Sequence, residues 1–332
     1  MRQLYYQHIS ERRQPINLKK EDISLFQHEF KVLIRETHLR KLSNVYIFAD
    51  LIFDIKKIRT FFSYCHIPKS KKIKSIIKRI PSLIRTSQKI ENGIWIIDNW
   101  SDGYYHWLTD ALPRLIAAES FYTDFPVILP SKYSTIEYVT SSLEQLNRKV
   151  IFYNPAQYVK IKELLLPSHT ALTGNYNKKI INNLRDRFQI KYQNIAKRRI
   201  YLSREKASIR KIKNEYEVQS LLRRFDYEIH CFEDYSFKKQ VEIMNETKSL
   251  VGLHGAGLTN MLFMPENGQV LELRKRDDNT NNCYFSLSSD LNHDYYYQLN
   301  EGNKNNTHDA VITVDLIELR KTLELMKTNY CT

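Results

Sequence analysis

One glycine-rich turn in this chain has a spacing that suits the binding of phosphate. Residues 251–260 read VGLHGAGLTN, an apolar strand that runs into a Gly-x-x-Gly-x-Gly turn and then into a helix. Glycines let a ligand approach the backbone, and a helix N-terminus offers unpaired N–H groups with a partial positive charge. The order differs from the dinucleotide fingerprint G-x-G-x-x-G, which disfavours NAD. The sequence therefore predicts a phosphate-binding turn, although glycines that serve packing alone would give the same pattern.

Charged and polar residues follow two other predicted strands. Glu272 is the lone acid in an apolar strand, and a buried acid is costly unless it is bound to something. At the carboxyl end of a parallel strand it would face a ligand crevice and could accept hydrogen bonds from ribose hydroxyls. Ser203, Arg204 and Lys206 end another strand, with Arg210 shortly after, and arginine grips phosphate with two hydrogen bonds. We expect an anion site here; the alternative is that these side chains lie in water at the surface.

A pair of residues in the first half of the chain could move a proton. His106 and Asp110 are four residues apart in a predicted helix and so share one face. Either could act as a general base on a hydroxyl, or the carboxylate could orient the imidazole and fix its tautomer. The alternative is a histidine capped by an aspartate on a helix surface. Because the chain has no Asp-x-Asp, H-E-x-x-H or G-x-S-x-G motif, we predict no metal site and expect basic groups to neutralise charge.

The elements that must position these residues alternate between strand and helix. From residue 92 short apolar strands are separated by helical segments, and a second series of the same kind begins at residue 200. This order predicts parallel sheets with helices on both faces. At 332 residues the chain has room for about two domains. We predict an α/β protein with domains at 1–195 and 196–332.

The charge of the chain predicts an anionic partner. The net charge is +14, and residues 55–90 hold eleven Lys or Arg with no acid. A basic segment interleaved with isoleucines can lie on an anionic membrane, and the alternative is a solvated helix face. Four scattered cysteines suit a reducing compartment, and the start of the chain lacks the apolar run of a signal peptide. We therefore expect a cytoplasmic protein, with peripheral attachment to the inner face of the plasma membrane.

Taken together, the motifs resemble those of family 61 glycosyltransferases. The resemblance covers about residues 90–300 and rests on four motifs in order: His106-Trp107-x-x-Asp110 with Leu112-Pro113, Tyr201-Leu202-Ser203-Arg204, Val251 to Asn260, and Val270-Leu271-Glu272-Leu273. It implies a GT-B-like fold, in which two Rossmann-like domains face each other across a cleft. The donor nucleotide would bind mainly to residues 196–332 and the acceptor mainly to residues 1–195. The donor-binding residues would be Ser203, Arg204, Lys206, Arg210, His254, Gly255, Ala256, Gly257, Leu258, Thr259, Asn260 and Glu272.

The resemblance implies an inverting glycosyltransferase that moves a sugar from a nucleotide-sugar donor to a glycan or lipid-linked acceptor. Asp110 would be the base, assisted or replaced by His106, and no cofactor or metal would be needed beyond the donor. Without a signal anchor, and rich in Lys, Ile, Asn and Tyr, the chain looks like a bacterial member that acts in capsular or other surface polysaccharide synthesis.

Two other functions remain as alternatives. A nucleic-acid-binding protein would use the basic charge, but no known nucleic-acid-binding module is recognisable and we expect no nucleic acid. An NAD-dependent sugar-modifying enzyme would need a different order of glycines.

Overall fold

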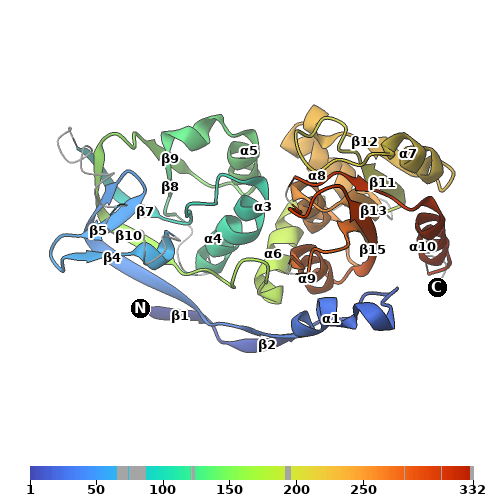
Figure 1. The fold of residues 1–332 in the computed structure, drawn as a ribbon. Coiled ribbons are helices and arrows are strands. Elements are labelled where there is room, and N and C mark those ends of the chain that lie inside the picture. Colours follow the sequence, from blue (N-terminus) through green and yellow to red (C-terminus); the bar gives the residue numbers. More distant parts are fainter. Residues whose placement is uncertain are drawn as a thin grey trace. The chain divides into compact units, whose positions relative to one another are not determined.

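The computed structural model describes residues 1–65, 74, 87–119, 121, 124–190, 196–279, 281–307 and 309–329. The chain divides into two compact units, unit 1 (Met1–His8 and Ile34–Thr173) and unit 2 (Ile9–Leu33 and Gly174–Thr332). Both are drawn in Figure 1. Most of the basic segment 55–90 lies outside the described residues.

Unit 1 is built on a mixed sheet. Its strand order is β6-β5-β4-β10-β7-β8-β9, and β1 also pairs with β4. The pairs β10–β7, β7–β8 and β8–β9 are parallel, whereas β4 pairs antiparallel with β10, β5 and β1, and β5 pairs antiparallel with β6. The bounds are β1 Arg2–Tyr5, β4 Thr37–Phe48, β5 Leu51–Asp54, β6 Arg59–Thr60, β7 Gln88–Ile94, β8 Val127–Pro130, β9 Val150–Tyr153 and β10 Tyr158–Pro167. The all-apolar β8 is buried along its whole length, as expected of a parallel strand covered on both faces.

The helices of unit 1 follow the parallel strands. They are α3 Tyr104–His106, α4 Leu112–Glu119 and α5 Glu137–Gln145, with 3-10 turns η3 Phe62–Tyr64 and η7 Ser131–Thr135. A π-helical turn, η6 Trp107–Ala111, joins α3 to α4 and is buried throughout. The single helix expected from about Tyr104 to Ser120 is therefore interrupted by a wider turn, a feature that recurs at functional sites. Pro113 lies in the first turn of α4, where a missing N–H is tolerated.

Unit 2 holds a sheet in the order β12-β11-β13-β14-β15-β16. All neighbours are parallel except β15 and β16. The bounds are β11 Arg198–Leu202, β12 Glu228–His230, β13 Thr247–Leu253, β14 Gln269–Lys275, β15 Asp294–Gly302 and β16 Ile312–Thr313. The predicted α/β class is confirmed in both units. The predicted parallel sheet is found in unit 2 except for β16, whereas the sheet of unit 1 is mixed.

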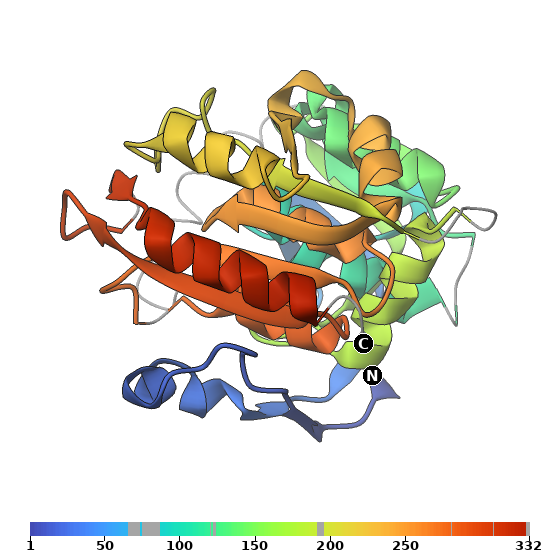
Figure 2. The same cartoon turned by 90° about the vertical axis from the view of Figure 1, so that its right-hand side faces the viewer.

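Helices cover both faces of this sheet. The helices α7 Glu215–Arg223 and α10 Leu316–Thr328 share one apolar core with the strands and lie over the face that Figure 2 turns toward the viewer. The other face carries α6 Lys178–Phe188, α8 Phe237–Asn245, α9 Cys283–Asp290 and the 3-10 helix η9 Ala256–Phe263, with a short turn η8 Phe232–Asp234. Because α6 packs on η9 and α9, it belongs with unit 2, although the sequence placed it before the boundary at residue 195.

An N-terminal segment, residues 9–33, also belongs to unit 2. It contains β2 His8–Glu11, η1 Lys20–Asp22, α1 Ile23–Phe26, η2 Gln27–Glu29 and β3 Lys31–Ile34. Phe26 packs edge-on against Phe285 and Tyr297, with ring centroids 5.2 and 4.9 Å away. Figure 2 shows the segment along the lower edge of unit 2.

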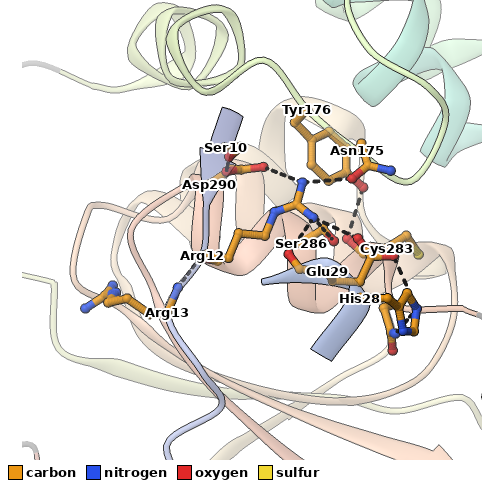
Figure 3. A network of polar contacts seen from close by, with 12 residues as sticks. Ser10, Arg12, Arg13, His28, Glu29, Asn175, Tyr176, Cys283, Ser286 and Asp290 are labelled. Atoms are coloured by element: carbon orange, nitrogen blue, oxygen red, sulfur yellow. Dashed lines mark hydrogen bonds and ion pairs between the residues drawn. The ribbon is translucent and has the colours of Figure 1, made fainter. Parts of the chain in front are cut away.

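The buried Arg12 connects this N-terminal segment to the rest of unit 2 through hydrogen bonds and an ion pair (Figure 3). The Arg12 guanidinium donates to Glu29 Oε2 and Ser286 Oγ, each at 2.9 Å, and to Asn175 Oδ1 at 2.9 Å. It also pairs with the buried carboxylate of Asp290 at 3.2 Å. A buried ion pair of this kind is costly to break because it leaves one charge uncompensated.

Candidate active site

The glycine turn leads from β13 into η9, and its glycines make room for neighbouring side chains. A Cβ on Gly255 would lie 2.7 Å from Arg204 Nη1, and one on Gly252 would lie 3.0 Å from Leu258 Cδ2. Gly257 has ordinary clearance, 3.5 Å from Leu202 Cδ1. The helix that the sequence places at about 258–263 is a 3-10 helix over Ala256–Phe263. Gly255 thus lets a guanidinium lie directly against the turn.

Later residues of the turn hold it in shape. Leu258, Thr259 and Asn260 are all buried, and Asn260 Nδ2 donates to the carbonyl of Gly257 at 3.0 Å. Asn260 therefore stabilises the turn in this structure, and Leu258 and Thr259 lie in its buried part. Ala256 is exposed beside them.

Two arginines stand together next to the turn. Arg204 donates from Nε to the carbonyl of Arg210 at 2.8 Å and from Nη2 to that of Ile209 at 2.9 Å. Arg210 Nη1 lies 3.5 Å from the carbonyl of His254. Burial lowers the pKa of Arg204, and the positive charge of Arg210 lowers it further. Two like charges held this close favour an anion between or beside them.

A buried carboxylate holds the start of this arginine turn. Glu215 Oε1 accepts hydrogen bonds from Ser203 Oγ at 2.7 Å, from the Arg204 backbone N–H at 3.0 Å and from the Tyr201 hydroxyl at 3.1 Å. The sequence analysis missed Glu215. Its position in the first turn of α7 indicates only a favourable interaction with the helix dipole. The hydroxyl of Ser203 is thus engaged, and Lys206 pairs with Asp234 at 2.5 Å on the exposed surface. Neither side chain joins the arginine pair in this structure.

Glu272 orients His254. Its carboxylate is completely buried, and its two oxygens bond to His254 Nδ1 and, at 2.5 Å, to the Tyr295 hydroxyl. Burial raises the pKa of Glu272, but His254, Arg274 and these hydrogen bonds together hold it below its ordinary value. The amide of Asn281 lies 2.8 Å from His254 Nε2. With neither oxygen facing solvent, this geometry gives Glu272 a positioning role and lends no support to the expected contact with ribose.

Arg274 balances the charge of Glu272. It lies two residues further along β14, and its guanidinium donates to Asn282 Oδ1 at 2.8 Å and to the carbonyls of Asp278 and Asn281 at 2.9 and 3.1 Å. The spacing of two puts both side chains on one face of the strand, a signal that could have identified the pair from the sequence. Tyr295 and Asn281 carried no such signal.

In unit 1, His106 and Asp110 meet as their spacing predicts. His106 Nδ1 lies 2.7 Å from Asp110 Oδ2, which also accepts from Thr173 Oγ1 at 3.2 Å. The aspartate side chain is 6% exposed and the histidine side chain 27%. His106 Nε2 makes no hydrogen bond with any residue that the structure describes. Of the alternatives, this geometry fits the one in which the carboxylate orients the imidazole and leaves Nε2 as the basic atom.

A second histidine–aspartate pair lies in the same unit. His169 Nε2 is 2.8 Å from Asp98 Oδ2, and the pair follows the carboxyl ends of β10 and β7. The buried Arg114 donates to the carbonyl of Pro167 from both Nε, at 3.1 Å, and Nη2, at 2.9 Å. Since these residues are far apart in sequence, local pattern could not bring them together.

Within the ranges given above, no group of three or more His, Cys, Asp or Glu side chains is placed to hold a metal ion. In the same part of the chain, none of the helices is long and apolar enough to cross a bilayer.

The fold and the site define an α/β protein with paired arginines at a glycine turn in one unit and an oriented histidine in the other. Residues 104–271, about half of the chain, match the family described as Glycosyltransferase 61. The chain belongs to this family.

Part of the chain is also similar to curated animal proteins. The chain is 32% identical over 124 residues to an EGF domain-specific O-linked N-acetylglucosamine transferase of Drosophila melanogaster, covering 36% of this chain and 23% of that protein. Proteins of the same description from Pan troglodytes and Gallus gallus are 32% and 30% identical over 98 and 101 residues, each covering 28% of this chain and 18% of the relative. The matched region thus spans about a fifth of these animal proteins.

Proposed function

We propose that this chain is an inverting glycosyltransferase that binds a nucleoside-diphosphate sugar in unit 2 and uses unit 1 to activate the acceptor. The observation that carries the proposal is the pair Arg204 and Arg210 beside Gly255 and His254. A diphosphate is an anion that two neighbouring guanidinium groups bind well, and they would stabilise it as a leaving group. The donor contacts expected of Ser203, Lys206, Ala256 and Glu272 remain predictions.

The transfer needs a base for the acceptor hydroxyl. We propose that His106 Nε2 takes the hydroxyl proton while the acceptor oxygen attacks the anomeric carbon and the bond from that carbon to the diphosphate breaks. Asp110 then stabilises the imidazolium and keeps the ring in orientation, as the short contact to Nδ1 supports. This reverses the emphasis of the sequence-based prediction, in which Asp110 was the base.

Our proposal for the substrates is based on the family and on the names of the similar animal proteins. We propose a nucleotide-activated sugar as donor, with N-acetylglucosamine the first candidate, and a glycan or lipid-linked acceptor. A role in capsular or other surface polysaccharide synthesis and a GT-B-like arrangement of the two units are further parts of the proposal, and both rest on the resemblance. We propose no metal and no cofactor beyond the donor.

We also propose a cytoplasmic location, with peripheral contact to an anionic membrane. The described part of the basic segment supports membrane contact, because the turn between β5 and β6 exposes Ile55 by 47% and Ile58 by 84%. Lys56 and Lys57 lie between them. Apolar side chains flanked by lysines suit the surface of an anionic bilayer. Flotation with phosphatidylglycerol vesicles at low salt tests the proposed membrane contact. If the chain does not bind these vesicles, the membrane contact is excluded.

The main experiment is calorimetric titration of the full chain with UDP, GDP, CMP and NAD. We expect one nucleoside diphosphate to bind, Arg204→Gln to weaken that binding at least tenfold, and His106→Ala to leave it unchanged while abolishing transfer. A protein that binds none of these ligands but shifts DNA or RNA in a gel at physiological salt would overturn the proposal in favour of nucleic-acid binding.

A further inference from the structure

One tryptophan lies exposed beside the proposed base. The chain has three tryptophans, and Trp95 and Trp107 are buried at 1% and 0% exposure, whereas Trp100 is 43% exposed. The ring centroids of Trp100 and His106 are 5.2 Å apart, with the planes inclined by 37°. A large aromatic surface that remains open to solvent next to a reactive group is typical of a binding site.

Hydrogen bonds within the loop hold the backbone at Trp100 in place. The Trp100 backbone N–H donates to Asp98 Oδ1 at 2.9 Å, and its carbonyl accepts from the Gly103 N–H at 2.9 Å. Ser101 Oγ also donates to Asp98 Oδ1, at 3.0 Å. The indole is therefore presented on a closed turn, which lowers the entropy lost when a ligand binds.

The buried charge of Asp98 maintains this turn. Burial would raise the pKa of Asp98, but hydrogen bonds from His169 and the Trp100 N–H, with the charge of Arg114, hold that pKa well below its ordinary value. The carboxylate thus stays ionised and keeps all its donors at neutral pH. A buried ionic network therefore fixes the backbone of the turn that carries Trp100, while Trp100 itself remains partly open to solvent.

Polar groups lie close by, in the same loop and in the turn η7. Asp102, two residues after Trp100, pairs with Lys132 Nζ at 2.8 Å, and its carbonyl accepts from the Tyr138 hydroxyl at 2.5 Å. The Asp102 and Lys132 side chains are 48% and 55% exposed. Exposed carboxylate and ammonium groups can exchange hydrogen bonds with the hydroxyls of a sugar.

We propose that Trp100 is the platform for the acceptor sugar: the C–H face of a pyranose stacks on the indole, which brings a ring hydroxyl toward His106 Nε2. Asp102 and Lys132 bind neighbouring hydroxyls. This assignment rests on the proposed function, because it takes His106 as the group that removes the hydroxyl proton. It adds the chemical class of the acceptor, a sugar unit with an apolar ring face.

The test measures sugar binding separately from donor binding. Saturation-transfer NMR with the methyl glycosides of N-acetylglucosamine, galactose, glucose and mannose should show contact with C–H protons of one ring face in the wild-type chain. Trp100→Ala should weaken that binding about tenfold, and Trp100→Phe should restore most of it. Tyr216→Ala, which removes a 79% exposed aromatic ring in unit 2, is the matched control and should change nothing.

Parallel titration with UDP distinguishes the two proposals. Unchanged nucleotide affinity in Trp100→Ala would confirm that unit 2 is intact, and loss of sugar binding alone would confirm the platform. Equal glycoside affinity in wild type and Trp100→Ala, or no saturation transfer from any of the four glycosides, would overturn the platform, whatever the nucleotide result. Failure of every nucleotide to bind would overturn the proposed function instead.

Discussion

Replacing Gly255 by alanine tests the anion site through geometry alone. The new Cβ would lie 2.7 Å from Arg204 Nη1 and 3.4 Å from Cζ, closer than a methyl group tolerates. The backbone at Gly255 is extended, with φ 160°, so alanine itself fits there. The guanidinium is the flexible end of its side chain and must move aside. We therefore expect Gly255→Ala to fold and to displace the arginine from the turn.

The size of the effect follows from the bonds that are lost. A hydrogen bond from a charged group is worth about 1.5–3 kcal/mol, so UDP should bind roughly 10- to 150-fold more weakly to Gly255→Ala. The stability loss should be about 1–2 kcal/mol, because the bonds from Arg204 to the carbonyls of Ile209 and Arg210 are weakened as well. Calorimetry with UDP and urea unfolding measure the two quantities.

Two other glycines provide controls. Gly257→Ala places its Cβ 3.5 Å from Leu202 Cδ1, an ordinary contact, and should bind UDP within about twofold of wild type. Gly93→Ala in unit 1 places its Cβ 2.2 Å from Ile128 Cγ1 and should lower stability by about 1–3 kcal/mol without a specific loss of UDP affinity. Wild-type UDP affinity in a folded Gly255→Ala protein would refute the argument that Arg204 binds the diphosphate.

Three further predictions concern stability and positioning. Burial lowers the pKa of His293 from 6.5 to about 3, so between these pH values only the unfolded chain takes up a proton at this residue. The free energy of unfolding should therefore fall by about 2 kcal/mol from pH 7 to pH 5. Urea unfolding of His293→Gln should show no such dependence on pH. Arg12→Met leaves Asp290 buried without its cation and should cost about 3–5 kcal/mol, whereas a cost below 1 kcal/mol would contradict the buried pair. Glu215→Ala removes the acceptor of Ser203 Oγ and should cost about 3 kcal/mol and weaken UDP binding; unchanged UDP affinity would show that Glu215 does not position the arginine turn.

The sequence could predict what depends on neighbours along the chain. The alternation of strands and helices predicted parallel sheets, and the spacing of four predicted the contact of His106 with Asp110. The lone acid Glu272 was correctly expected to need a partner, but the partner is supplied by the protein itself: Tyr295 comes from the adjacent strand β15. Such cross-strand neighbours depend on sheet order, which periodicity does not encode.

Contacts between distant segments could not be predicted. The pairing of Asp98 with His169 joins the ends of β7 and β10, which lie beside each other only because β10 inserts between β4 and β7. Residues 9–33 could not be assigned from local pattern because they are stabilised by unit 2 and not by their own sequence neighbours. For the same reason the positions of Arg12 and Phe26 in the core of unit 2 had no local signal.

The assignment of residues 9–33 to unit 2 means that no single cut yields two self-sufficient fragments. The backbone passes between the units after His8, after Leu33 and again after Thr173. A fragment that starts at Gly174 would leave the rings of Phe285 and Tyr297 uncovered, and the carboxylate of Asp290 would lose its ion pair with Arg12. We expect a synthetic peptide of residues 9–33 to restore these contacts in trans, which makes this protein a candidate for fragment complementation.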